Sequence, residues 1–158
     1  MKIPNATYRI QFTPFFGFTD ALEIVDYLVS LGVSWIYASP IFEARKGSLH
    51  GYDAVNPTRL NPELGAKGEF DELTAALAQR NMGWLQDTVP NHMAYTGENP
   101  MLADLFSLGR NSVFYDFFDI FWDHPSGHFS GKVAAPFLGD RLEACIDRGE
   151  IRLALRQG

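Results

Sequence analysis

The order of apolar patterns along the chain constrains the fold more than any other feature. Residues 7–12 alternate polar and apolar side chains, which is typical of a strand with two unlike faces. Apolar residues recur at helical spacing over residues 19–32, and residues 33–38 then favour a second strand. After a long connection, a second helical stripe ends near Asn81, and residues 84–89 favour a third strand.

This alternation predicts an α/β fold, because strands separated by helices pair in parallel through right-handed crossovers. Both α/β sheets and α/β barrels place ligand sites at the carboxyl ends of their strands. The loops that matter are therefore residues 39–58 and the segment from Pro90 onward.

The pattern changes near Met93, after which no further strand-helix unit is predicted. Residues 113–122 are a dense aromatic run, interpreted as core, with a sugar-stacking platform as the alternative. A short helix is expected near residues 140–148.

Length and composition narrow the class of protein. The 158 residues correspond to one domain or a part of one. A net charge of −6 argues against nucleic acid and anionic membrane as partners, because Lys and Arg must supply that attraction. No apolar run approaches the roughly 20 residues that cross a bilayer. The first residues lack a signal peptide's apolar core, and Cys145 is a lone cysteine, so a cytoplasmic location is expected.

A carboxylate, an amide and an imidazole come close together in residues 87–92, Asp-Thr-Val-Pro-Asn-His. The segment begins inside the third predicted strand and leaves it at its carboxyl end, where a polar ligand needs such groups. The spacing leaves a structural alternative open, in which Asp87 pairs with a neighbouring arginine and His92 caps a loop.

A second group, His50-Gly51-Tyr52-Asp53, lies in the loop after the preceding strand. Gly51 permits close backbone approach, and Tyr52 offers a stacking face with a polar tip. Alone, such a turn is more often packing than chemistry, but two clusters on adjacent strand ends favour a site.

Signals for several other chemistries are absent. The sequence has no GxSxG, Walker or GxGxxG motif. His124 and His128 have the spacing of a helical metal pair, but Pro125 and Gly127 between them break a helix. No metal site is predicted there.

The motifs together resemble the start of the maltooligosyl trehalose synthases, a branch of the α-amylase superfamily. The resemblance covers nearly the whole chain and is carried by residues 7–12, 37–40, 47–53, 61–65, 87–93, 108–110 and 137–143. The Asp-x-x-x-Asn-His element is shared across the superfamily. The Tyr-Arg-x-Gln-Phe and Ser-x-His-Gly-Tyr-Asp elements are more particular to the trehalose-forming branch.

The resemblance implies a fold and a reaction. Residues 1–92 would form the first part of a catalytic (β/α)8 TIM barrel, about three βα units, and residues 93–158 the incomplete start of a subdomain inserted after the third strand. The implied reaction is an intramolecular transglucosylation that converts the reducing-end α-1,4 bond of a maltooligosaccharide into an α,α-1,1 trehalose bond. Retention of configuration requires a carboxylate nucleophile and a second carboxyl group as acid and base.

Site residues carry over position by position. The resemblance implies that Tyr52 stacks on the sugar ring, that His50 and His92 hydrogen-bond its hydroxyls, and that Asp87 supports the pocket from the strand end.

Asp53 and Asn91 take supporting positions. Asn91 matches a residue that helps to bind structural calcium in some relatives, but the resemblance implies no metal and no cofactor for this branch.

The family's nucleophile and acid/base come from the fourth and fifth barrel strands, so no catalytic residue is expected in this chain before Gly158. The expected partners are a maltooligosaccharide and the remaining C-terminal part of the barrel. Three alternatives stay open: another superfamily hydrolase or glucanotransferase, a non-catalytic maltooligosaccharide-binding fragment, and a small α/β domain with an unrelated role.

Overall fold

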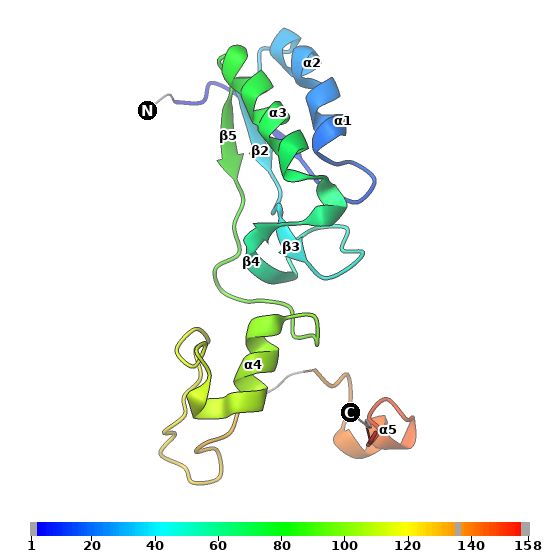
Figure 1. Ribbon diagram of the computed structural model, residues 1–158, viewed down its shortest axis with the longest axis vertical. Coiled ribbons are helices and arrows are strands. Elements are labelled where there is room, and N and C mark those ends of the chain that lie inside the picture. The colour runs from blue at the N-terminus through cyan, green and yellow to red at the C-terminus, as the bar shows by residue number, and fades with distance from the viewer. Residues whose placement is uncertain (1–2, 135–136, 156–158) are drawn as a thin grey trace. The chain divides into compact units, whose positions relative to one another are not determined.

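The computed structural model describes residues 3–134 and 137–155, and the chain divides into two compact units, Met1–Tyr115 and Asp116–Gly158. The elements are β1 (Thr7–Ile10), α1 (Phe18–Glu23), α2 (Val25–Ser30), β2 (Trp35–Ala38), β3 (Phe42–Ala44), β4 (Ala54–Leu60), the 3₁₀ helix η1 (Pro62–Leu64), α3 (Lys67–Gln79), β5 (Gly83–Gln86), α4 (Pro100–Leu108), the 3₁₀ helix η2 (Gly109–Asn111) and α5 (Leu142–Asp147) (Figure 1). The predicted subdomain boundary between residues 92 and 93 stays a prediction, and the compact units divide later, after Tyr115.

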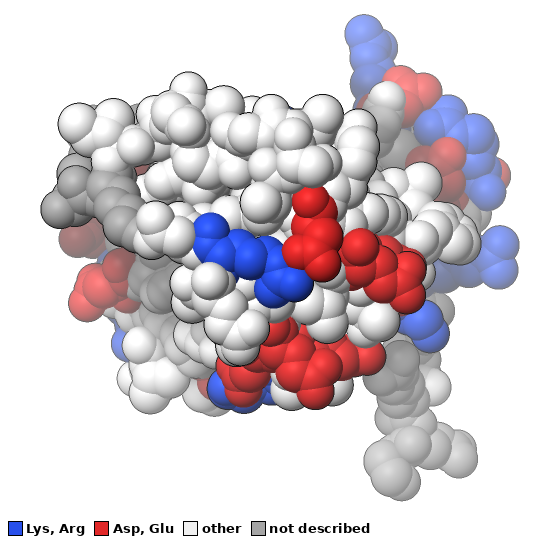
Figure 2. Space-filling model, turned by 90° about the horizontal axis from the view of Figure 1, so that it is seen from above, with Lys and Arg blue, Asp and Glu red and all other residues white. Residues whose placement is uncertain are grey.

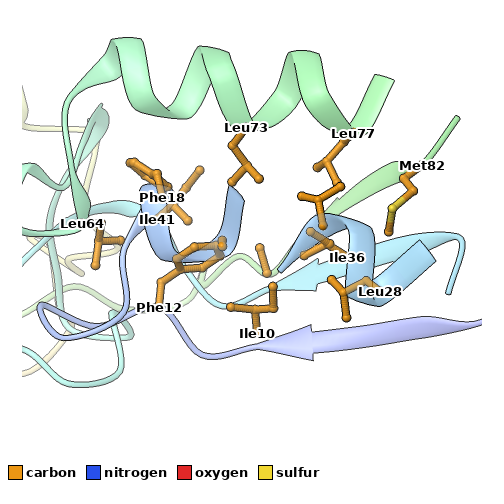
Figure 3. Packing of buried hydrophobic residues seen from close by; sticks show 13 residues of the cluster. Ile10, Phe12, Phe18, Leu28, Ile36, Ile41, Leu64, Leu73, Leu77 and Met82 are labelled. Atoms are coloured by element: carbon orange, nitrogen blue, oxygen red, sulfur yellow. The ribbon is translucent and has the colours of Figure 1, made fainter. Parts of the chain in front are cut away.

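The first unit is built on a parallel sheet in the order β1-β2-β5, which confirms the predicted α/β arrangement. The register pairs Arg9 with Tyr37 and Tyr37 with Leu85. Helices α1, α2 and α3 lie on one face of this sheet (Figures 1 and 3). Since side chains alternate along a strand, the other face carries Arg9, Tyr37 and Leu85.

The hydrophobic core lies between the sheet and these helices. Leu73 and Leu77 of α3 point toward the sheet, where Ile36 of β2 is fully buried (Figure 3). The rings of Phe12 and Phe18 have centroids 5.6 Å apart, which joins the end of β1 to α1. Full burial of each such side chain is worth about 1.5–3 kcal/mol, so this face supplies most of the first unit's stability.

The helix predicted over residues 19–32 is two helices. The first begins at Phe18 rather than after a Thr19 cap, and the Asp20 carboxylate accepts a hydrogen bond from Gly17 N at 2.7 Å. Ile24 leaves helical geometry with φ −94° and ψ 0° and separates α1 from α2. The apolar stripe continues across this break, which is why the sequence pattern did not show it.

The long connection between β2 and α3 contains an antiparallel hairpin, β3 paired with β4, that the sequence pattern did not predict. Strand β3 has only three residues, and β4 contains Pro57, a residue confined to sheet edges because it lacks a backbone donor. The hairpin register also shifts on both sides of Glu43, so its period-two signal is weak.

Strand β5 ends at Gln86 instead of Val89, and Asp87 therefore follows the strand directly. Helix α4, also unpredicted, begins at a clear signal: the fully buried Asn99 side chain accepts bonds from Met101 N and Leu102 N at 3.1 Å, with Pro100 in the first turn. The predicted short helix near residues 140–148 is confirmed as α5.

The interpretation of residues 113–122 as core is wrong for the structure described. None of these ten residues is buried, and Val113, Phe117 and Phe121 are 85%, 51% and 66% exposed. Within the described residues of the second unit, α5 is the one helix and no strand is present, so no sheet or long helix of that unit covers this run.

The amino-terminal end of the sheet carries charges of both signs. Seen from above Figure 1, acidic and basic side chains lie side by side on a largely uncharged face (Figure 2). Arg80, just before β5, forms an ion pair with Asp26 of α2.

Within the described ranges, no helix has the length and apolar character that crossing a membrane requires.

Candidate functional site

Asp87 lies at the carboxyl end of the sheet, on the polar face that is opposite the hydrophobic core. Its backbone N donates to Ala38 O at 2.9 Å, which continues the ladder between β2 and β5 by one residue. Its Oδ2 accepts a hydrogen bond from Tyr37 Oη at 3.1 Å, and the side chain is only 18% exposed. Asp87 thus lies at the carboxyl end of β5 with its carboxylate held by a residue of β2.

Residues 48–53 form a tight turn between β3 and β4. Gly51 has φ 73°, and a Cβ there would lie 2.6 Å from Pro40 O, so only glycine fits. The Ser48 hydroxyl donates to Asp53 and accepts from Gly51 N at 3.1 Å. Asp53 therefore supports the turn through Ser48, and its supporting position at a sugar site stays a prediction.

Tyr52 is brought to Asp87 by this turn. Its hydroxyl donates a hydrogen bond to Asp87 Oδ2 and accepts one from Arg9 Nη2 at 2.7 Å. The bond to Asp87 raises the pKa of Tyr52, burial raises it further, and Arg9 opposes both effects. The phenol therefore stays protonated as a donor at neutral pH.

His50 lies beside Tyr52. The two rings stack with centroids 6.1 Å apart and an interplanar angle of 29°. His50 Nδ1 accepts from Tyr52 N at 3.0 Å and lies 3.7 Å from Asp53 Oδ1. In the neutral imidazole the remaining donor is therefore Nε2, and 55% of the side chain is exposed to solvent.

Asn91 and His92 are exposed in the segment after β5. Among the described residues, no side-chain hydrogen bond or ion pair connects either of them to Tyr52 or Asp87. The structure thus brings together His50, Tyr52 and Asp87, and the convergence of His92 on them stays a prediction. The alternative in which His92 caps a loop has no hydrogen bond to support it in the described part of the chain.

Asp87 also has the arginine partner that the structural alternative required, so the ion pair and the predicted site are present together. Arg9 Nη2 lies 3.8 Å from Asp87 Oδ2, and the guanidinium carbon lies 5.4 Å from the centre of the Tyr37 ring. Sequence reasoning assigned no role to Arg9, Gln11 or Tyr37. The available signal was their alternation: polar side chains at every second position of a strand share the face on which Asp87 lies.

Two of the cavities among the described residues are lined by other side chains. One of about 420 Å³ in the first unit includes Glu43, Glu63 and Glu98, and two of these carboxylates hold a turn: Glu63 accepts from Gly47 N at 2.8 Å and Glu98 from Lys46 N at 2.9 Å.

The other cavity, of about 600 Å³ in the second unit, is lined by residues that include Phe121, His124, His128 and Phe129. Over residues 3–134 and 137–155, no group of three or more His, Cys, Asp or Glu side chains has the arrangement to hold a metal ion.

Comparison with known proteins identifies the family. The family model "Alpha amylase, catalytic domain" matches residues 17–139. A Mycobacterium tuberculosis protein described as a candidate maltooligosyl trehalose synthase is 41% identical over 141 residues, which are 85% of this chain and 18% of that protein. A crystal structure of maltooligosyl trehalose synthase superposes with a TM-score of 0.81 at 37% identity, covering 93% of this chain and 20% of that one.

More distant members match the same region. The maltogenic alpha-amylase of Bacillus acidopullulyticus is 32% identical over 120 residues, covering 75% of this chain and 20% of that protein. The chain thus spans about a fifth of the length of these relatives. The fold neighbours place its parallel strands in the TIM-barrel class, as predicted. The chain belongs to the α-amylase catalytic domain family.

Proposed function

We propose that this chain supplies the first part of the catalytic barrel of a longer maltooligosyl trehalose synthase. The observation that carries the proposal is the hydrogen bond from Tyr52 to Asp87, which joins both predicted clusters at the carboxyl ends of β2 and β5. Similarity to maltooligosyl trehalose synthases over most of the chain supports the choice of branch.

In this proposal the site holds the glucose ring at the point of cleavage. Tyr52 is fixed at its hydroxyl by two partners and packs beside the His50 ring, and in this proposal the ring face turned away from His50 stacks on the sugar. His50 donates to a sugar hydroxyl through Nε2, and His92 donates from the exposed segment after β5. The open face of the sheet becomes the lining of the barrel mouth.

Asp87 acts as a support and not as the nucleophile. Its Oδ2 already accepts hydrogen bonds from Tyr37 and Tyr52, which fix its position and occupy the oxygen that would have to attack. The nucleophile attacks the anomeric carbon while the acid protonates the leaving 4-oxygen, which forms a glycosyl-enzyme and releases the chain-end glucose. The deprotonated acid then takes the proton from the 1-hydroxyl of that glucose, whose oxygen attacks the anomeric carbon and displaces the nucleophile. Both carboxyl groups are proposed to come from barrel strands that follow residue 158.

The experiment incubates the longer protein and, separately, the 158-residue chain with maltopentaose and compares their products. A trehalose-forming enzyme converts the reducing end into a trehalose unit, so reducing sugar falls while total glucose stays constant. Product analysis by mass spectrometry and NMR shows an unchanged mass and an α,α-1,1 signal. The 158-residue chain, which lacks the proposed carboxylates, gives no product under the same conditions.

A second function is a hydrolase or glucanotransferase of the same family, favoured by similarity to the maltogenic alpha-amylase. A hydrolase raises reducing sugar, and an intermolecular glucanotransferase leaves it constant while chain lengths redistribute. Either result rejects trehalose formation. Binding of maltopentaose without turnover in the longer protein identifies instead a binding module.

A further inference from the structure

We infer that Arg9 and Gln11 are positioning residues that hold Tyr52 and the His50 turn in place at the sugar site. The inference rests on the function proposed above and adds a role for two residues of the first strand. Neither residue needs to touch the sugar, because both act through side chains that do.

Arg9 connects three elements through one guanidinium group. Nη2 donates to Tyr52 Oη at 2.7 Å and lies 3.8 Å from Asp87 Oδ2, while Nη1 donates to Gln11 Oε1 at 3.0 Å. A guanidinium is planar and its donors keep a fixed geometry, so these contacts also fix one another.

Gln11 extends the connection from side chain to backbone. Its Nε2 donates to His50 O at 3.1 Å, so the amide holds the turn at its backbone while Arg9 holds the same turn at the Tyr52 hydroxyl. The turn is thus held on both sides of Gly51, at the His50 carbonyl and at the Tyr52 hydroxyl, and these two contacts orient the Tyr52 ring relative to the sheet.

These hydrogen bonds lie away from the hydrophobic core, so their loss is expected to change activity more than stability. Arg9 is on the face of the sheet opposite the hydrophobic core, and its side chain is 39% exposed. Exposed ion pairs contribute about 0–1 kcal/mol to stability, so these contacts add little to the fold. Misplacing a reacting group by about 1 Å costs on the order of 100-fold in rate.

The test measures kcat and KM of the longer protein with Arg9→Gln, Arg9→Lys, Gln11→Leu and the double variant Arg9→Gln/Gln11→Leu. Arg80→Gln is the matched control, because it removes an arginine–carboxylate pair at the amino-terminal end of the sheet. We expect kcat/KM to fall about 10- to 100-fold in Arg9→Gln, with unchanged melting, and to stay within about twofold in Arg80→Gln.

Two further results are expected from a positioning role. Arg9→Lys restores only part of the activity, since one ammonium cannot bond Tyr52 and Gln11 in the same geometry. The double variant loses little more than Arg9→Gln alone, because both residues act through one connected chain. Additive losses, full rescue by lysine, or lower melting with unchanged kinetics would overturn the inference.

A readout independent of turnover separates this inference from the proposed reaction. In the 158-residue chain labelled with ¹³Cζ-tyrosine, Arg9→Gln removes a donor that lowers the pKa of Tyr52, so the Tyr52 titration midpoint rises. An unchanged midpoint overturns the positioning inference. If the wild-type protein hydrolyses maltopentaose, the proposed reaction is wrong, and the same variants are then compared on reducing-sugar release.

Discussion

The Tyr52 hydroxyl donates a hydrogen bond to the Asp87 carboxylate, although the two residues lie 35 positions apart. This bond connects the turn before β4 with the end of β5. Because the two residues belong to the two clusters predicted from the sequence, the bond turns two separate loop motifs into one site.

The first prediction concerns the ionisation of Tyr52. Asp87→Asn removes the charge that, through its hydrogen bond, raises the pKa of Tyr52 most, so the midpoint falls. A raised pKa means that this bond stabilises the fold fully below pH ~10 and that the stabilisation is lost as pH rises through the folded value. The ¹³Cζ signal of Tyr52 measures the midpoint, with Asp26→Asn as the control that removes a paired carboxylate elsewhere.

The turn at Gly51 provides a second test. Gly51→Ala forces a Cβ to 2.6 Å from Pro40 O at φ 73°, and we expect a loss of about 2–4 kcal/mol in the free energy of unfolding. Gly47→Ala is the matched control, because Gly47 has φ 74° with nothing within 4 Å of an added Cβ. We expect it to lower the free energy of unfolding by about 1 kcal/mol. Urea unfolding followed by tryptophan fluorescence measures both. Equal losses would mean that the approach to Pro40 is not the constraint.

The core packing under α3 makes a third prediction. Leu73 is fully buried, and Leu73→Ala should reduce the free energy of unfolding by about 2–5 kcal/mol through lost burial and a cavity. Leu31→Ala, at a side chain that is 52% exposed, should change it by about 0.5 kcal/mol or less. A similar result for both variants would contradict the placement of the core.

The fourth prediction is that His92→Ala changes the kinetics of the longer protein and not its stability. The His92 side chain is exposed and makes no hydrogen bond among the described residues, so His92→Ala should leave the melting temperature unchanged. Loss of a hydrogen bond that strengthens in the transition state lowers kcat and kcat/KM together, by about tenfold or more. Normal kinetics with reduced thermal stability would assign His92 a structural role.

The last prediction concerns the 158-residue chain by itself. In the described sheet, β1 and β5 are the outer strands, and each has one unpaired edge that can associate with another copy. We expect size-exclusion chromatography to show association that increases with concentration, and we expect no turnover of maltopentaose. A monomeric chain with a sharp cooperative melt and trehalose-ended product would contradict both expectations.

The sequence by itself determined the parallel α/β arrangement and the ends of the sheet at which a site could lie. Apolar periodicity is a local signal, and it marked β1, β2, β5 and α3 because each buries one face against the same core. The pattern missed the β3–β4 hairpin, whose three-residue strand and Pro57 carry little periodicity. It also overestimated the burial of residues 113–122, since density of aromatic residues says nothing about what covers them.

Only the tertiary structure decided which polar residues join the site. Asp87 and Tyr52 were predictable because each follows a strand end in a recognisable motif. The alternation of Arg9 and Gln11 in and just after β1 indicated only the face on which they lie. Their partners were decided by the register, which sets Arg9 beside Tyr37, and by the Gly51 turn, which brings Tyr52 to Arg9. Strand register depends on contacts between segments far apart in the chain, and local sequence patterns do not encode those contacts.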